Sequence, residues 1–239
     1  MDIKNKAIVI TGAASGLGEA TATYLSNLGA KIFRLDKNKI SDDIIECDIT
    51  DENNLKKTID SFDAIHAVVH CAGISHAKRL IGKNGAMALS EFQKIIQINL
   101  IGTFNMMKFS AEKMSKQNII SQNGERGVII NTASVAAFEG QVGQIAYSAS
   151  KGALVSMTLP AARELAQFGI RVMTIAPGIM QTPMMTAMSQ TIQKELSNAV
   201  LFPKKLGNPT NFAELVAHII QNDYLNGSTI RLDGGLRLS

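Results

Sequence analysis

The chain has 239 residues, which is enough for one large α/β domain or two small ones. Hydrophobic residues make up 46% of it and charged residues 18%, a globular composition that excludes a disordered chain. The formal net charge of +4 comes without a basic stripe, which argues against nucleic acid as a partner and suits small anionic ligands.

Two cysteines, Cys47 and Cys71, are too few for a disulfide framework or a four-ligand zinc site, so no metal site is expected. We expect both to be small buried hydrophobes in a reducing compartment. The first apolar run, Ala7–Ile10, is too short for a secretory signal, and no stretch reaches the ~18 apolar residues needed to span a membrane. These observations predict a cytoplasmic protein with no membrane partner.

Short apolar runs alternate with longer helical stretches along the chain. The predicted strands are Ala7–Ile10, Lys31–Leu35, Asp43–Cys47, Ile65–Val69, Val128–Asn131, Arg171–Ile175 and Ser228–Leu232. The predicted helices are Gly16–Asn27, Asp51–Ser61, Ser90–Ser115, Tyr147–Gln167 and Asn211–Asn222. This alternation predicts right-handed crossovers, a parallel sheet with helices on both faces, and a single domain over 1–239.

Three segments between these elements have their own composition. Ile74–Leu89 and Gln117–Gly127 are rich in Gly, Asn, Gln and Lys and are predicted to be loops. Gly178–Pro203 is bounded by prolines and rich in methionine. A flexible, polarisable methionine cluster suits an adaptable lid over a hydrophobic chain, although ordinary core packing is the competing interpretation.

A glycine-rich turn follows the first predicted strand and opens the first helix, within Thr11–Gly18. Gly12 permits a tight turn, Gly16 lets the backbone approach a pyrophosphate, and Gly18 allows close packing of helix on strand. The helix N-terminus then offers free N–H groups and a positive dipole end to the phosphates. The turn residues expected to bind a dinucleotide are Gly12, Ser15, Gly16, Leu17 and Gly18.

Asp36 ends the second predicted strand, where a carboxylate can accept hydrogen bonds from both ribose hydroxyls of NAD and would repel the 2′-phosphate of NADP. Ser15 is neutral at a place where a basic residue would favour that phosphate. Arg34, Lys37 and Lys39 lie nearby and weaken the exclusion of NADP. NAD is therefore the expected cofactor, and a solvated aspartate at a strand end is the alternative.

Tyr147 and Lys151 lie four residues apart and share one face of the predicted helix. A lysine beside a tyrosine stabilises the phenolate and lowers its pKa, so Tyr147 could act as an acid and base nearer neutral pH. Such pairs are common by chance, and the value of this one comes from Ser134, thirteen residues upstream.

Together these motifs resemble those of the short-chain dehydrogenase/reductase family over essentially the whole chain. The matching features, in family order, are Thr11–Gly18, Asp48, Cys71–Gly73, Asn99, Ser134, Tyr147 with Lys151, Pro177–Gly178 and Asp233–Gly235. The resemblance implies a doubly wound Rossmann fold with a seven-stranded parallel sheet, usually assembled as a homotetramer.

The resemblance also implies residue roles. Tyr147 would be the general acid and base, Ser134 would hold the substrate oxygen, and Lys151 would bind the nicotinamide ribose. Asn99 would hold a helix irregularity and a water of the proton relay. The implied cofactor contacts beyond the turn are Asp48, Ile49, Cys71, Ala72, Gly73, Pro177, Gly178, Ile179, Met180 and Thr182.

One departure from the family pattern is Cys71-Ala72-Gly73, where asparagine is usual at the first position. This variant is typical of a subgroup, the type 2 3-hydroxyacyl-CoA dehydrogenases, which Gly127–Gln144, Arg171–Gly178 and Leu225–Asp233 also resemble. The extended loop Ile74–Leu89 is similar to that subgroup's insertion.

Gln141 lies between Ser134 and Tyr147 in the sequence, and the resemblance places it in the acyl pocket; a solvated glutamine is the alternative. A small basic cluster in the loop after Gly73 could meet a CoA phosphate or could simply be solvated. Its members are His76, Lys78, Arg79 and Lys83.

The sequence thus predicts an NAD-dependent oxidoreductase that interconverts a 3-hydroxyacyl-CoA and a 3-oxoacyl-CoA. The enzyme alternatives are an NADP-dependent 3-oxoacyl-ACP reductase and a dehydrogenase of steroid-like alcohols. The non-enzyme alternative is a dinucleotide-sensing scaffold on the same fold.

Overall fold

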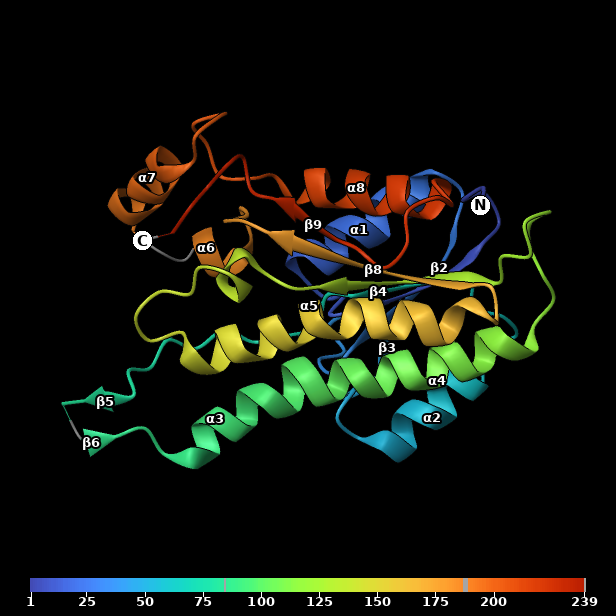
Figure 1. Ribbon diagram of the computed structural model, residues 1–239, viewed down its shortest axis with the longest axis horizontal. Helices are drawn as coiled ribbons and strands as arrows, with labels where there is room; N and C mark the ends of the chain where they lie inside the picture. The colour runs from blue at the N-terminus through green and yellow to red at the C-terminus, as the bar shows by residue number, and fades with distance from the viewer. Residues whose placement is uncertain (84, 187–188, 239) are drawn as a thin grey trace.

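The central feature of the computed structural model is a parallel sheet with the strand order β3-β2-β1-β4-β7-β8-β9 (Figure 1). The structure describes residues 1–83, 85–186 and 189–238, and seven strands in these ranges form the sheet. They are β1 (Ala7–Thr11), β2 (Lys31–Asp36), β3 (Ile44–Glu46), β4 (Ala67–His70), β7 (Gly127–Thr132), β8 (Ile170–Pro177) and β9 (Thr229–Leu232). A separate antiparallel ribbon pairs β5 (Ile81–Gly82) with β6 (Gly85–Ala86).

Helices cover both faces of the sheet, as Figure 1 shows. One face carries α1 (Gly16–Asn27) and α8 (Pro209–Gln221), which pack against each other. The other face carries α2 (Glu52–Asp60), α4 (Thr103–Lys116) and α5 (Ile145–Ala166). The shorter elements are α3 (Leu89–Ile96), α6 (Pro183–Thr186), α7 (Gln190–Ala199), the π-helical turn η1 (Gln97–Gly102) and the 3₁₀ turn η2 (Val135–Ala137). This arrangement confirms the predicted doubly wound fold.

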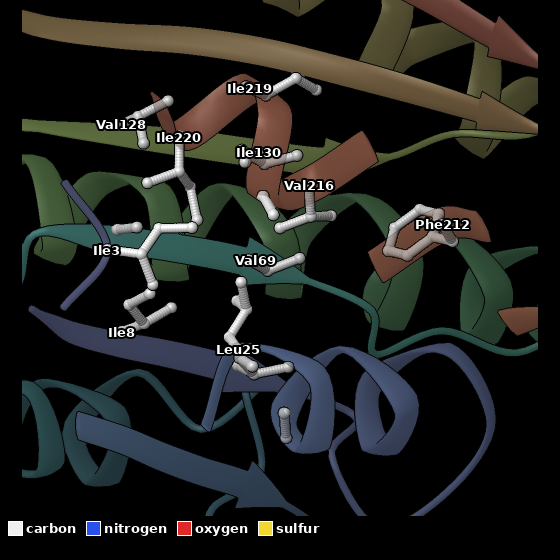
Figure 2. Packing of buried hydrophobic residues seen from close by; sticks show 14 of the residues in the cluster. Ile3, Ile8, Leu25, Val69, Val128, Ile130, Phe212, Val216, Ile219 and Ile220 are labelled. Atoms are coloured by element: carbon white, nitrogen blue, oxygen red, sulfur yellow. The ribbon is translucent and has the colours of Figure 1, made fainter. Parts of the chain in front are cut away.

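The core forms because alternate residues of each central strand point to opposite faces of the sheet. Toward α1 and α8, the buried side chains of Ile8, Val69 and Ile130 meet Leu25 and Phe212 (Figure 2). The intervening residues, such as Val9 and Val68 of neighbouring strands, face α4 and α5 instead. Burying each such side chain contributes roughly 1.5–3 kcal/mol.

A row of polar residues lies on the face toward α4 and α5, two positions further along the strands than Val9 and Val68, toward the carboxyl ends. Thr11 pairs in register with His70, His70 with Asn131, and Asn131 with Thr174. All four are buried on the face that carries α4 and α5. The sheet therefore changes from an apolar to a polar interior directly beneath the strand ends, where ligands bind in open α/β sheets.

The predicted helix Ser90–Ser115 is interrupted in the structure. It divides into α3, η1 and α4, with π-helical hydrogen bonding over Gln97–Gly102. The interruption has a packing counterpart, because a Cβ added to Gly102 would lie 2.6 Å from Cγ1 of Ile49. Hydrophobic periodicity alone did not predict this interruption of the helix.

Two of the remaining segments contain more structure than the sequence indicated. The predicted loop Ile74–Leu89 includes the β5–β6 ribbon, and Gly178–Pro203 includes α6 and α7. Two parts of the predicted methionine lid lie outside what the structure describes: residue Met188 and the side chain of Met184. Met180 is buried and pairs with Gly207 through an isolated bridge.

Candidate active site

The carboxyl ends of the central strands gather the predicted catalytic side chains in one place. Ser134 follows β7, Tyr147 and Lys151 lie in the first turns of α5, and Asn99 lies in η1. Gly73, after β4, lies between two of them, since a Cβ added there would be 3.2 Å from Asn99 Oδ1 and 3.5 Å from Lys151 Nζ. A glycine at this position keeps the space between the amide and the ammonium open.

Lys151 is held by the end of β7. Its side chain is 5% exposed, and its Nζ donates a 2.7 Å hydrogen bond to the carbonyl oxygen of Thr132. The same Nζ lies 5.8 Å from the centre of the Tyr147 ring. Burial disfavours the charged ammonium and lowers the pKa of Lys151 from 10.5 to about 8.

The pKa of Tyr147 is raised, whereas the sequence predicted that Lys151 would lower it. Burial raises the pKa of Tyr147 above its usual 10, and the opposing effect of the Ser134 hydroxyl does not reverse this. Lys151 does not lower it, because its ammonium is directed to the Thr132 carbonyl. The Ser134 Oγ also accepts a 3.2 Å hydrogen bond from the backbone N–H of Ala136, which fixes its position at the start of η2.

Asn99 is fully buried and joins two parts of the site. Its Oδ1 accepts a hydrogen bond from the Ile74 N–H (2.8 Å), and its Nδ2 donates to the Ile74 carbonyl (2.9 Å) and to Ser150 Oγ (3.1 Å). Ser150 Oγ donates in turn to the Tyr147 carbonyl (2.7 Å). The turn after β4 is thereby fixed to the helix that carries Tyr147 and Lys151. The predicted irregularity at Asn99 is present as η1, and its bound water remains a prediction.

The glycine-rich turn packs tightly against the end of β4. Gly12 has φ +67°, and a Cβ there would lie 2.7 Å from the Ala72 nitrogen; a Cβ on Gly18 would collide with the Gly12 carbonyl. Helix α1 begins at Gly16, and its N-cap, Ser15, makes no side-chain capping bond. The first N–H groups of α1 therefore remain available to an anion, and the turn fits a dinucleotide diphosphate.

Two carboxylates border the expected adenosine side of the cleft. Asp36 accepts hydrogen bonds from the backbone N–H groups of Ala14 (3.1 Å) and Asn38 (2.9 Å), which orient it at the end of β2. For Asp48, burial alone would raise the pKa, but hydrogen bonds from Thr50 and the Lys37 ammonium lower it. Ile49 is buried beside Gly102, so η1 supports the expected adenine wall.

Cys71 and His70 carry no charge near neutral pH. Burial raises the pKa of the Cys71 thiol to about 12, which excludes a reactive thiolate in this state. Burial, aided by the Lys151 charge, lowers the pKa of His70 to about 3. Cys47 is buried as predicted, whereas Cys71 is only partly buried because it borders the cleft.

The opposite wall of the cleft comes from the end of β8 and the segment after it. A Cβ added to Gly16 would lie 3.5 Å from Thr182 Cγ2, so the phosphate turn and the start of the methionine segment face each other. Pro177 ends β8 beside the last strand, and the N–H of the next residue, Gly178, donates to the Leu232 carbonyl (2.9 Å). Thr182 thus faces the phosphate turn, and the cofactor contacts of Gly178, Ile179, Met180 and Thr182 remain a prediction.

Gln141 is exposed and lines an open cavity of about 680 Å³ between loop 78–81 and residues 136–148. Apolar side chains of Leu80, Ile81 and Val142 share this cavity with Arg79. Ser134 and Tyr147 do not line it, so it adjoins the catalytic group from the side. Within the predicted basic cluster, Lys78 forms a salt bridge with Glu91.

Sequence reasoning missed two participants in the site. Ser150 lies inside the Tyr147–Lys151 motif and connects it to Asn99, and the backbone carbonyl of Thr132 holds Lys151. Ser150 could have been found from its helical position three residues after Tyr147. The role of Thr132 depends on a backbone atom, which its side-chain type does not disclose.

Comparisons with known proteins agree with this geometry. The sequence model of a family described as short chain dehydrogenase matches residues 6–193. The chain belongs to the short-chain dehydrogenase family. It is therefore an oxidoreductase of a family that uses a nicotinamide cofactor.

Individual relatives cover almost the full chain. Two are named 3-hydroxyacyl-CoA dehydrogenase type-2: one from Bos taurus, 47% identical, and one from Homo sapiens, 46% identical, each over 99% of this chain and 97% of its own length. A solved structure of 3-hydroxyacyl-CoA dehydrogenase type-2 from Mycobacterium avium has a TM-score of 0.92 and 33% identity, covering 98% of this chain and 97% of that chain. The predicted family and fold are confirmed.

Two searches of the described residues concern metal sites and membrane-spanning helices. Across the described ranges, the structure groups no three His, Cys, Asp or Glu side chains in a way that could hold a metal ion. A search of the same ranges finds that none of the helices combines the length and apolarity required for a membrane crossing.

Proposed function

We propose that this protein interconverts a 3-hydroxyacyl-CoA and a 3-oxoacyl-CoA, with NAD as the hydride acceptor in the oxidative direction. The observation that carries the proposal is the joint placement of Ser134, Tyr147, Lys151 and Asn99 at the same edge of the sheet as Asp36, which ends β2. The high identity to proteins named 3-hydroxyacyl-CoA dehydrogenase type-2 supports the substrate class.

NAD bound in the cleft would supply the nicotinamide carbon that accepts the hydride from C3 of the hydroxyacyl group. In its phenolate form, Tyr147 would accept the hydroxyl proton as C3 loses its hydride, so that a carbonyl forms at C3. Ser134 Oγ donates a hydrogen bond to the substrate oxygen, which is most valuable where negative charge develops. The ammonium of Lys151 is held by the Thr132 carbonyl, 5.8 Å from the centre of the Tyr147 ring; a cofactor ribose that drew it toward the phenol would favour the phenolate form.

The choice of NAD rests on Asp36. Its carboxylate already accepts two backbone N–H groups, and its remaining lone pairs suit two ribose hydroxyls. A 2′-phosphate at the same place would meet a like charge. The implied adenine contacts of Asp48 and Ile49, and those of Cys71 and Ala72, complete the proposed cofactor side.

The acyl-CoA thioester is matched by the surface beside the catalytic group. The cavity next to Gln141 combines apolar side chains with the Arg79 guanidinium, which suits a chain that ends in an anionic carrier. A homotetramer, a cytoplasmic location and a single domain over 1–239 remain predictions of the family resemblance and composition.

Replacing the acid and base tests the chemistry directly. We expect Tyr147→Phe to lower kcat by ~100- to 10,000-fold, the usual worth of general acid–base catalysis. Binding of NADH, measured by fluorescence titration, should stay within about threefold of wild type, since the ring and its packing are retained. Near-normal turnover by this variant would refute the proposed mechanism.

A kinetic panel tests the substrate. Short, branched and long 3-hydroxyacyl-CoAs should be compared with steroid-like alcohols and acyl-carrier thioesters, each with NAD and NADP. We expect the highest kcat/KM for a 3-hydroxyacyl-CoA with NAD. A preference for NADP or for another alcohol class would favour the alternative dehydrogenases, and no turnover of any substrate would favour a dinucleotide sensor.

A further inference from the structure

The turn Asp233–Gly235, which follows β9, takes no part in the proposed chemistry, although the sequence singles it out. In the structure, Arg231 of β9 and the turn together contact three segments: the loop that carries Gln141, the end of β8, and the residues that follow α7. Figure 1 shows the end of β9 close to the segments that carry α6 and α7. This convergence raises the question of what the turn does for the reaction.

The contact with the loop that carries Gln141 is ionic. Arg231 donates from Nη1 to Glu139 Oε1 (2.8 Å) and from Nη2 to Glu139 Oε2 (3.2 Å), a two-pronged pairing. Its Nε donates to Asp233 Oδ2 (2.7 Å), and its guanidinium lies 5.3 Å from the centre of the Phe138 ring. Glu139 is only two residues from Gln141, so Arg231 restrains the part of the loop that meets the cavity.

The contact with β8 is steric and hydrogen-bonded. A Cβ added to Gly178 would lie 2.9 Å from both Cα and Cβ of Asp233. The Gly178 N–H donates to the Leu232 carbonyl, and Pro177 pairs in register with Leu232. Gly178, on the expected nicotinamide side of the cleft, therefore packs against Asp233, the residue to which Arg231 also bonds.

The contact with the segment after α7 depends on the two glycines of the turn. The Phe202 N–H donates to the Gly234 carbonyl (3.1 Å), and a Cβ on Gly234 would lie 2.6 Å from Val200 Cγ1. Gly234 and Gly235 have φ of +60° and +79°, which other residues rarely adopt. The C-terminal end of the methionine segment 178–203 is thus fixed to the turn Asp233–Gly235.

The charges in this cluster balance. Arg237 joins Arg231 by approaching Glu139 (3.4 Å) and Asp233 (3.2 Å), so two guanidiniums face two carboxylates. The side chains of Arg231 and Glu139 are 23% and 21% exposed, and that of Asp233 is 8% exposed. Partly buried, mutually bonded ion groups of this kind fix geometry more firmly than an isolated surface pair.

We infer that Arg231 is a positioning residue, which fixes the loop 138–144 and the segment 200–202 to the end of β8 and so sets the shape of the acyl-binding side. The substrate part of this inference rests on the proposed function, whereas the coupling of the segments does not. Loss of the Glu139–Arg231 pair should therefore weaken binding of the acyl substrate and leave the cofactor side largely unchanged.

The kinetic test compares Glu139→Gln, Arg231→Gln and the double variant. We expect Glu139→Gln to raise KM for the acyl-CoA about tenfold, or about 1.4 kcal/mol, with kcat and the Kd of NADH within about twofold of wild type. The double variant should match Arg231→Gln rather than add to it, because both changes break one link. Asp60→Asn, which removes the exposed Lys56–Asp60 pair on α2, is the control and should change none of these values.

Amide hydrogen exchange tests the coupling without relying on turnover. Both single variants should exchange faster than wild type in 138–144 and also in 200–202, while Asp60→Asn should not. Faster exchange in only one segment, an unchanged KM, or additive losses in the double variant would each overturn the inference. If the wild-type protein does not act on acyl-CoA at all, the exchange result still decides whether the segments are coupled.

Discussion

At the scale of single residues, the buried charge of Lys151 lowers the stability of the folded protein. Its ammonium is buried with one backbone acceptor, and burial lowers its pKa from 10.5 to about 8. A shift of this size corresponds to about 3 kcal/mol of unfavourable charge burial. The penalty is fully present below about pH 8, where the folded protein still carries the charge, and is lost as the pH rises toward 10.5.

Removing this charge should therefore stabilise the cofactor-free protein while abolishing activity. We expect Lys151→Met to raise the thermal midpoint at pH 7 by about 2–4 °C, a net gain near 1 kcal/mol once the unpaired Thr132 carbonyl is counted. The advantage should shrink between pH 8 and 10.5. Scanning calorimetry at several pH values measures both effects, and a lower midpoint at pH 7 would contradict the argument.

Asp36 makes a second prediction at this scale. Asp36→Ser should raise the ratio of kcat/KM for NADP to that for NAD by at least about tenfold, because the repelled phosphate then meets a neutral hydroxyl. Asp63→Asn removes an exposed carboxylate before β4, at the opposite ends of the strands, and serves as the control. An unchanged ratio in Asp36→Ser would show that cofactor choice lies elsewhere.

At the scale of elements, the sequence located most strands and helices but not their irregularities. The strand predicted as Asp43–Cys47 is Ile44–Glu46, and the helix predicted as Tyr147–Gln167 is Ile145–Ala166. The π turn at Gln97–Gly102 was foreseen only through the family resemblance, since it depends on a tertiary contact with Ile49. The same limit applies to Arg231, because its partner Glu139 lies 92 residues away in the sequence and only the fold brings the two together.

The turn η1 yields a prediction of its own. Gly102→Ala places a methyl group 2.6 Å from Ile49 Cγ1, so we expect a loss of ~1–3 kcal/mol in unfolding free energy and weaker NAD binding. Gly152→Ala on α5 is a matched control, because its nearest neighbour, the Ala137 carbonyl oxygen, is at 3.7 Å. That change should be neutral or stabilising by up to ~1 kcal/mol through helix propensity. Denaturant melts of both variants make the comparison.

At the scale of the whole molecule, one buried ion pair joins elements that lie far apart in the sequence. Arg171, at the start of β8, bonds Glu125 through Nε (2.9 Å) and Nη2 (2.8 Å). It also donates to the carbonyls of Ile219 and Ile220 at the end of α8 and to that of Leu225. Through this one side chain, the loop before β7, the sheet and the last helix are held together at the end opposite the active site.

Breaking this link should destabilise the fold without touching the chemistry. We expect Arg171→Met to cost ~3–5 kcal/mol, because buried Glu125 would lose its guanidinium and keep only the N-terminal ammonium, 3.5 Å from its Oε2. Glu112→Gln, which removes an exposed pair with Lys116 on α4, should change stability by less than ~1 kcal/mol. Equal effects of the two substitutions in equilibrium unfolding would contradict the assigned difference in burial.

The polar row that crosses the sheet beneath the active site has a consequence for the pH–rate profile. Thr11, Asn131 and Thr174 do not ionise, and His70 gains its proton only near pH 3. Cys71, which follows His70 in the chain, loses its proton only near pH 12. These side chains therefore stay uncharged between about pH 3 and pH 12, and we expect the pH dependence of turnover to come from Tyr147 and Lys151 instead.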